Sequence, residues 1–159
     1  MHRILEIIEN NADLTAKDIA TMLGTDVNEV EKALEQYKAE GVIVGKRTVI
    51  NWQKTSREYV TAMIELKVTP QFGKGFDEIA ERFYQYDQVK NVFLMSGGYD
   101  LALTVEGKTL TDVAMFVSEK LAPMDQVLST ATHFVLRKYK EDGVLLTGDK
   151  KDERRVMMF

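Results

Sequence analysis

Residues 96–100, Ser-Gly-Gly-Tyr-Asp, combine residue types that could bind a small charged molecule. The adjacent glycines Gly97 and Gly98 can bring backbone N–H groups within reach of an anion such as a carboxylate. Asp100 could accept hydrogen bonds from an ammonium group, and Tyr99 offers a flat wall with a polar tip. These features complement the two ends of a free amino acid. The alternative is a simple hairpin turn, in which the glycines adopt positive φ and Asp100 caps the turn.

Groups that could perform catalysis are few. The chain has two histidines, His2 and His133, and no cysteine. It contains no HExxH motif and no Gly-Lys-Ser/Thr phosphate loop, so metal and nucleotide sites are not indicated. We interpret His133 as a sheet or interface histidine rather than a proton donor. We therefore expect no catalytic residues, no metal and no other cofactor.

Two short helices separated by a glycine are predicted between residues 14 and 41. Thr15 can cap the first helix by accepting hydrogen bonds from the free amides of its first turn. Ala20, Gly24 and Val30 have the spacing of a helix-turn-helix: a small residue at the crossing, a hinge glycine and an aliphatic residue that locks the pair. Gly41 can end the second helix. The same pattern is typical of any αα-hairpin in a small helical domain, so both interpretations stay open at this point.

The exposed face of the second helix is acidic, which opposes binding to phosphate. Its solvent-facing residues are Asp26, Asn28, Glu29, Glu31, Lys32 and Glu35. A helix that reads a DNA groove usually offers Arg, Lys, Asn or Gln. Residues 42–44 and 49–51 predict two short extended pieces around a basic turn, which is the shape of a wing. Lys46 and Arg47 at its tip are the candidates for phosphate contacts.

The composition is that of a folded protein without an obvious attraction to nucleic acid. The chain has 159 residues, of which 45% are hydrophobic, and a formal net charge of −4. Contacts with DNA must therefore be local. No apolar run approaches the roughly 20 residues of a membrane span, and the absence of cysteine agrees with a reducing compartment. We expect a cytoplasmic protein with no membrane contact.

From residue 59 onward the pattern changes to strand, helix, strand, strand, helix, strand. Strands are predicted over residues 59–68, 89–95, 101–105 and 127–136, and helices over residues 73–86 and 109–121. The second helix is expected to bury Leu110 and Ala114 with its other apolar residues. This order is typical of the ferredoxin-like arrangement, a four-stranded antiparallel sheet with two helices on one face.

One face of that sheet would be left without helices. We expect it to be partly apolar, through Met63, Phe93, Met95, Leu101, Leu103 and Val135. An exposed apolar sheet of this size is usually a subunit interface, so we infer at least a dimer.

The expected organisation is α+β with two domains. A winged helix-turn-helix domain covers residues 1–51, a polar linker 52–58, a ferredoxin-like domain 59–136 and a tail 137–159. Trp52 in the linker is expected to pack on a partner or at the domain junction. The tail ends in Val-Met-Met-Phe, which would either dock on a neighbour or fray.

The chain resembles the Lrp/AsnC, or feast/famine, transcription regulators from roughly residue 4 to residue 136. The segment LGTDVNEVEKALEQYKAEGVI is similar to the helix-turn-helix of that family. The segments VFLMSGGYDLALTVEG and LSTATHFVL are similar to its ligand-sensing (RAM) domain. The resemblance implies a homodimer joined through the open sheet faces, commonly assembled into octamers. It would bind double-stranded DNA and respond to a small effector, usually an amino acid.

The resemblance also implies which residues act. DNA contacts are expected from Thr25, Asp26, Val27, Asn28, Lys32, Lys46 and Arg47. The effector is expected between subunits, at a site formed by Ser96, Gly97, Gly98, Tyr99, Asp100, Ser129, Thr130 and Thr132. The acidic second helix departs from the serine, threonine and arginine that many members carry there.

Two other classes of function stay open. Some proteins similar to this family are sirohaem decarboxylases, whose helix-turn-helix need not read DNA. They depend on histidine and arginine residues around a large cleft, and this chain offers only His133 and a few arginines. The other class is an interaction adaptor that binds no DNA and presents its acidic helices to a partner protein.

Overall fold

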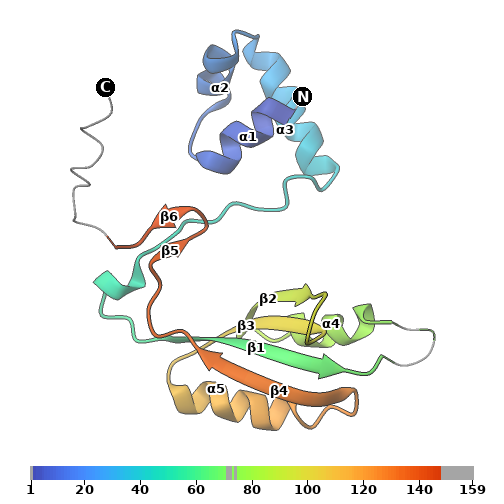
Figure 1. The fold of residues 1–159 in the computed structure, drawn as a ribbon. Helices are drawn as coiled ribbons and strands as arrows, with labels where there is room; N and C mark the ends of the chain where they lie inside the picture. Colours follow the sequence, from blue (N-terminus) through green and yellow to red (C-terminus); the bar gives the residue numbers. More distant parts are fainter. Residues whose placement is uncertain (1, 71–72, 74, 148–159) are drawn as a thin grey trace. The chain divides into compact units, whose positions relative to one another are not determined.

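The computed structural model describes residues 2–70, 73 and 75–147 (Figure 1). The chain divides between Val49 and Ile50 into two compact units. The N-terminal unit is helical, and the C-terminal unit is built on a sheet. Each unit has its own hydrophobic core.

The N-terminal unit has three helices, α1 (His2–Asn10), α2 (Ala16–Leu23) and α3 (Val27–Ala39). The helix-turn-helix prediction is confirmed. Ala20 and Val30 are at most 2% exposed and lie in the same core, so the two helices cross where the small residue permits it. Gly24 between them adopts φ 66°, a left-handed conformation that suits glycine.

The segment between the two cores carries no wing strands. Residues 42–51 form no strand, so the extended pieces predicted at residues 42–44 and 49–51 do not form the strands of a wing. The N–H groups of Val42 and Ile43 instead donate to the Tyr37 carbonyl near the end of α3. Lys46 instead donates a hydrogen bond from Nζ to the carbonyl of Ala12, at 2.8 Å.

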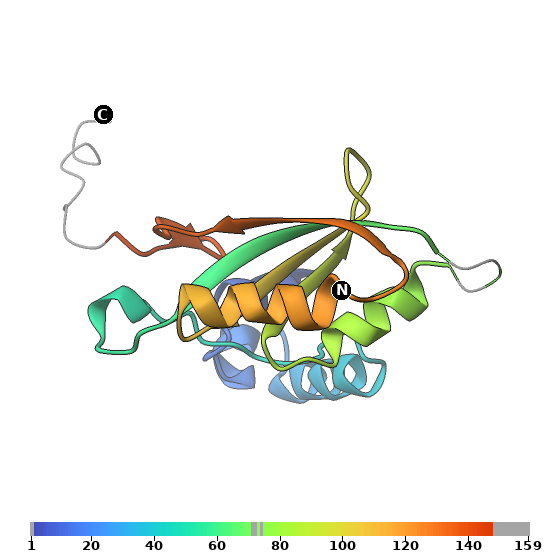
Figure 2. The ribbon, with the colours of Figure 1, turned by 90° about the horizontal axis from the view of Figure 1, so that it is seen from below.

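The C-terminal unit confirms the ferredoxin-like order. Its strands are β1 (Val60–Val68), β2 (Val89–Leu94), β3 (Leu101–Gly107) and β4 (Val127–Phe134). They form an antiparallel sheet in the order β2-β3-β1-β4. Its helices are α4 (Asp77–Tyr84) and α5 (Leu110–Phe116), and α5 continues as a π-helical turn, η2 (Val117–Leu121). Figure 2 shows α4 and α5 across the same face of the sheet.

Strand pairing decides which residues face the helices. Ile64 and Leu66 of β1 are fully buried, and they stand opposite Leu103 and Leu101 of β3. Directly paired residues share a face, so both β3 leucines lie in the core under the helices. Their predicted place on the open face is therefore wrong.

Helix α5 also buries fewer residues than expected. Leu110 is 55% exposed, and Ala114 is exposed as well. Val113, Phe116 and Leu121 make the contacts with the sheet. Helix α4 begins later than the predicted residue 73, since Gly73 and Gly75 adopt positive φ before it.

A small hairpin after the sheet was not predicted. Strands β5 (Lys140–Glu141) and β6 (Val144–Leu145) pair around Asp142 and Gly143, which adopt φ 45° and 81°. Positive φ at both central residues is the signature of a type I′ turn. A 3₁₀ turn, η1 (Trp52–Lys54), lies in the stretch expected to be a linker. The apolar end at residues 156–159 lies outside the described residues.

Candidate functional sites

Three residues at the start of α3, all expected to contact DNA, hold the turn between α2 and α3. The Asp26 carboxylate accepts a hydrogen bond from the backbone N–H of Asn28 at 2.8 Å and so caps the helix. Thr25 Oγ1 donates to the Glu29 carboxylate. Val27 packs against the core of the unit. Their side chains therefore position the start of the helix.

The remaining expected DNA contacts are exposed polar side chains. Lys32 and the side chain of Asn28 lie on the solvent side of α3, and Lys32 has no charged or hydrogen-bonding partner among the described residues. Arg47 is exposed in the segment after α3. Glu31 and Glu35 are exposed next to Lys32, so the acidic character seen in the sequence persists on the folded surface.

The turn at residues 95–100 is anchored to the sheet through Asp100. Its N–H donates to the Leu66 carbonyl at 2.9 Å, and its carbonyl accepts from Met95 N–H at 2.8 Å. Asp100 Oδ2 accepts a hydrogen bond from Val68 N–H at 2.9 Å. The carboxylate that could receive an ammonium group thus already caps the end of β1.

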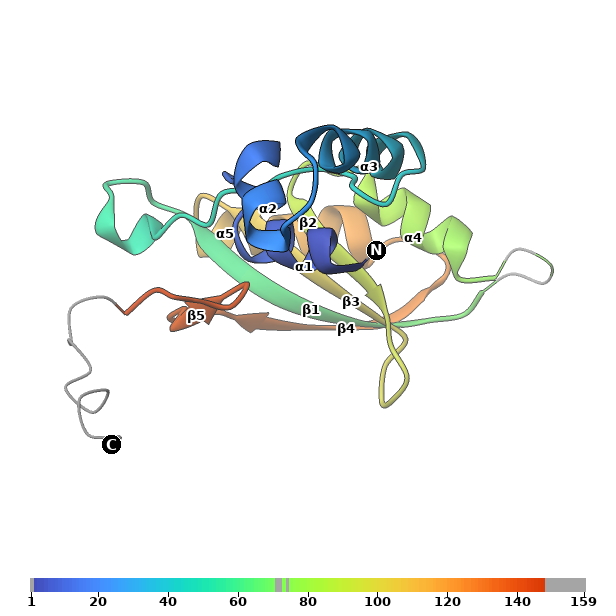
Figure 3. The ribbon, with the colours of Figure 1, turned by 90° about the horizontal axis from the view of Figure 1, so that it is seen from above.

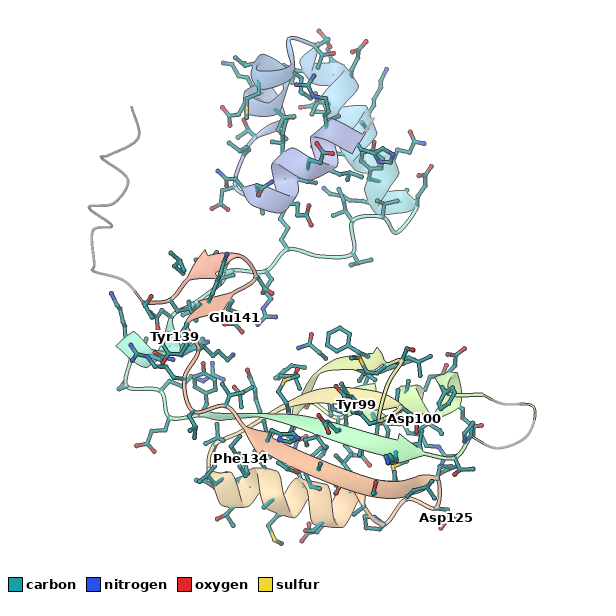
Figure 4. The ribbon with its side chains drawn as sticks, viewed as in Figure 1. Tyr99, Asp100, Asp125, Phe134, Tyr139 and Glu141 are labelled. Carbon is teal, nitrogen blue, oxygen red and sulfur yellow. The ribbon has the colours of Figure 1, made fainter. Side chains whose placement is uncertain are left out.

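The glycines of that turn are accessible, but their conformation differs from the prediction. Neither Gly97 nor Gly98 adopts positive φ, and a side-chain carbon built on either would meet no atom within 4 Å. The backbone N–H groups of residues 96–99 donate to no described residue. The turn therefore presents amides of exposed residues, and Tyr99 and Asp100 lie where it returns to the sheet (Figure 4).

The hydroxyl residues of β4 do not share a face. Ser129 pairs with Lys67 and lies on the open face, whereas Thr130 and Thr132 pair with the buried Leu66 and Ile64. Alternation along a strand sends neighbours to opposite faces. Within one chain, β1 also separates β4 from the turn at 95–100, so a single subunit does not gather all the expected effector residues.

The open face of the sheet mixes apolar and polar side chains. Met63 is 40% exposed and Phe93 is 50% exposed. The ring of His133 lies in β4 with Nε2 3.6 Å from Glu65 Oε1. Figure 3 views this side, which no helix in the described part of the C-terminal unit covers.

A cleft of about 1040 Å³ opens at the end of the sheet away from the turn at residues 95–100. The sequence did not predict this cleft. It lies between the segment before β1, the end of β3 and the start of α5. Acidic and basic side chains both line it, including Arg57, Glu106 and Lys108. None of the expected effector residues belongs to this cleft.

The carboxyl group of Asp18 has a lowered pKa. The hydroxyl and backbone N–H of Thr15 hold the pKa of Asp18 below its usual 3.8, because both donate to the ionised form. Within the described part of the chain, no group of three His, Asp or Glu side chains is placed to hold a metal ion. None of the helices in the described residues has the length and hydropathy of a membrane span.

Comparison with known proteins covers both units. The family profile of the Lrp/AsnC ligand binding domain matches residues 61–145, and that of a winged helix-turn-helix DNA-binding domain matches residues 2–44. An uncharacterised HTH-type transcriptional regulator of Bacillus subtilis, YugG, is 48% identical over 157 residues, covering 98% of this chain and 93% of its own.

Solved structures agree with this fold. Escherichia coli AsnC superposes with a TM-score of 0.66 at 20% identity, over 87% of this chain and 91% of its own. A Neisseria meningitidis transcriptional regulator, solved as a complex with L-Met, gives a TM-score of 0.70 at 19% identity, over 89% and 91% of the two chains. The two matched domains, in this order and over most of the chain, show that the protein belongs to the Lrp/AsnC family of HTH-type transcriptional regulators.

Proposed function

We propose that the chain is a cytoplasmic, homodimeric transcription regulator whose binding to double-stranded DNA changes when it binds an amino acid. The observation that carries the proposal is a helix-turn-helix unit joined to a ferredoxin-like sheet with one uncovered, partly apolar face. That face would form the dimer interface, and octamers would be the higher assembly. The L-Met complex of the Neisseria relative supports an amino acid as effector. The function requires no catalysis and no cofactor.

The proposed DNA surface comprises Thr25, Asp26, Val27, Asn28, Lys32, Lys46 and Arg47. The first three position the start of α3, and Asn28 and Lys32 face the groove. Lys46 and Arg47 contact the phosphate backbone. Because the surface around them is acidic, one subunit binds weakly, and affinity depends on two subunits engaging one duplex together.

The phosphate contacts are tested with the double variant Lys46→Ala/Arg47→Ala. DNA fragments retained by the wild-type chain at low salt serve as the probe. The variant should bind all of them more weakly, and the slope of log affinity against log salt should fall by roughly 0.9 for each phosphate that is no longer neutralised. The variant Lys108→Ala/Lys120→Ala removes the same charge from the C-terminal unit and should keep the wild-type slope. Equal slopes in all three proteins would remove this basic pair from the interface.

The proposed effector site is the turn at 96–100 of one subunit together with Ser129, Thr130 and Thr132 of a partner's β4. Gly98 is the position to change, because it has an ordinary φ and open space, so a larger side chain does not strain the fold. Gly98→Leu should abolish the binding of amino acids measured by calorimetry, while the oligomer measured by light scattering stays unchanged. Gly45→Leu, at an equally open glycine in the N-terminal unit, is the matched control. Undiminished binding to Gly98→Leu would place the effector elsewhere.

An interaction adaptor is the second candidate, and the acidic surface of α3 favours it. Glu29, Glu31 and Glu35 are exposed there, as expected for a helix that meets a basic partner protein. An adaptor would retain no genomic DNA fragment even at low salt. A regulator would retain a limited set of fragments.

A further inference from the structure

Two segments that are far apart in the sequence meet beside the start of β1. We call residues 51–59 and 137–146 together the linker clasp. The Asn51 side chain donates from Nδ2 to the carbonyl of Leu146. The Gln53 side chain donates from Nε2 to the carbonyl of Lys138 at 3.3 Å. Both bonds join a side chain of the first segment to the backbone of the second.

Aromatic rings and cations fill the space around these bonds. The Arg57 guanidinium lies 4.3 Å from the centre of the Trp52 ring, and the Lys138 ammonium lies 5.7 Å from that of Tyr59. Such cation–π contacts are attractive at this range. The Lys138 ammonium also forms a 2.8 Å ion pair with Glu141 of β5. One lysine therefore connects β5 to the residue that leads into β1.

The second segment is itself folded. Asp142 and Gly143 form the turn of the β5–β6 hairpin, and Leu146 N–H donates to the carbonyl of Tyr139 at 2.9 Å. Leu146 is only 7% exposed. Figure 4 shows Tyr139 and Glu141 on this arm, at the opposite end of the unit from Tyr99 and Asp100.

The linker clasp connects β4 to the chain that leads to the helix-turn-helix. Strand β4 lies at an edge of the sheet, and its last bond to β1 runs from Val135 N–H to the carbonyl of Thr61. The clasp begins two residues later. On its other side, Asn51 lies two residues after Val49, where the N-terminal unit ends. The second segment of the clasp therefore follows β4 directly along the chain, and its contacts with the first segment join it to the linker.

The linker clasp is more exposed than the core of the sheet. Most of its first segment, residues 53–58, is exposed. Asn51 Oδ1 is buried and accepts no hydrogen bond from a described residue. An unsatisfied buried acceptor favours any state in which water can reach it. Segments with these properties open at lower free energy than a core.

We propose that effector binding alters DNA binding through the linker clasp. In its closed state the clasp fixes the linker, and in its open state the clasp releases the linker. Asn51 is its positioning residue. The proposal rests on the function proposed above, because it assigns the coupling between the two sites of that function. A ligand that moves β4 favours one state of the clasp and so changes how the DNA-binding units are presented.

Hydrogen exchange on the full chain tests whether the linker clasp is one opening unit. Asn51→Ala should speed the exchange of amides in both of its segments, while amides of β1 and β3 exchange as in the wild type. Asn10→Ala removes the same kind of bond, an Asn Nδ2 to a backbone carbonyl, from α1 and is the matched control. Faster exchange confined to residue 146, or spread over the whole sheet, would overturn the proposal.

DNA binding with and without a mixture of the twenty amino acids tests the coupling. In Asn51→Ala the change in DNA affinity caused by the mixture should fall to less than roughly twofold, below the range typical of allosteric coupling, while calorimetric amino-acid binding persists. A full wild-type response in Asn51→Ala would overturn the clasp and leave the proposed function standing. A wild-type chain whose DNA binding ignores the mixture would instead overturn the proposed function, and the coupling role with it.

Discussion

The two candidate sites of this chain differ in the groups that they present. The surface of α3 depends on exposed side chains, carried by a small core in which three residues are buried, Ile19, Ala20 and Val30. The turn at 95–100 depends on backbone amides, carried by a much larger core under a four-stranded sheet. In both, an aspartate that could bind a ligand instead holds the backbone: Asp26 caps α3 and Asp100 caps β1. The free groups that remain are charges at one site and amides at the other.

The largest expected effect tests the difference between the two cores. Phe83 in α4 is fully buried in the core of the C-terminal unit. Phe83→Ala should lower the free energy of unfolding of this unit by about 3–5 kcal/mol, because it leaves a cavity under the sheet. Hydrogen exchange of the β1 and β3 amides measures this free energy. The N-terminal helices, followed by circular dichroism, should keep their own transition.

The neighbouring residue provides the control. Tyr84 is 58% exposed, so Tyr84→Ala should change the same free energy by less than about 0.5 kcal/mol. Equal losses in the two variants, or a simultaneous collapse of the N-terminal helices in Phe83→Ala, would contradict the division into two separate cores.

The second prediction concerns the double role of Asp100. Asp100→Ala removes the acceptor for the Val68 N–H, which should cost the C-terminal unit about 1–3 kcal/mol. Asp100→Asn keeps an oxygen at that place and should recover most of the loss. If Asp100 acts only as a cap, Asp100→Asn also retains the response to amino acids. Normal stability with a lost response would show that the carboxylate receives the ammonium group of the effector.

The framework of both units could be predicted from the sequence because it depends on local signals. The helix-turn-helix was predictable from the spacing of Ala20, Gly24 and Val30. The order of strands and helices was predictable because the hydrophobic period changes between that of a strand and that of a helix. The turn at Asp142 and Gly143 had a readable signal as well, since Asp-Gly is typical of a type I′ turn. This Asp-Gly pair lies in the stretch predicted to be a tail.

Contacts between residues that are far apart in the sequence could not be predicted. Alternation divides Leu101 and Ala102 between two faces, but only pairing with Leu66 decides which face is the core. The hydrogen bond between Asp100 and the Val68 N–H could not be predicted, because the two residues lie 32 positions apart. The two segments of the linker clasp are separated further still, and no local pattern marks them as neighbours.

The third prediction tests whether Asp26 of α3 has two roles, as a helix cap and as a DNA contact. Asp26→Ala removes the cap of the helix and should destabilise the N-terminal unit by about 1 kcal/mol. Asp26→Ser keeps a capping oxygen without the charge, so it should restore stability in thermal unfolding. Since it also removes a negative charge near the DNA surface, it should bind DNA at least as tightly as the wild type. Weaker binding by Asp26→Ser would mean that the carboxylate itself contacts DNA.

The smallest effect is a pH dependence confined to the N-terminal unit. Hydrogen bonds from Thr15 depress the pKa of Asp18 in the folded state. A carboxyl group with a depressed folded pKa stabilises the fold above its unfolded pKa, near 3.8, and that contribution disappears as the pH falls through the folded value. Helical melting of the unit should therefore shift downward below about pH 4. Asp18→Asn cannot titrate, so its melting temperature should vary less over the same range. An identical acid profile in both proteins would show that the capping box of α2 does not contribute to the acid sensitivity of the N-terminal unit.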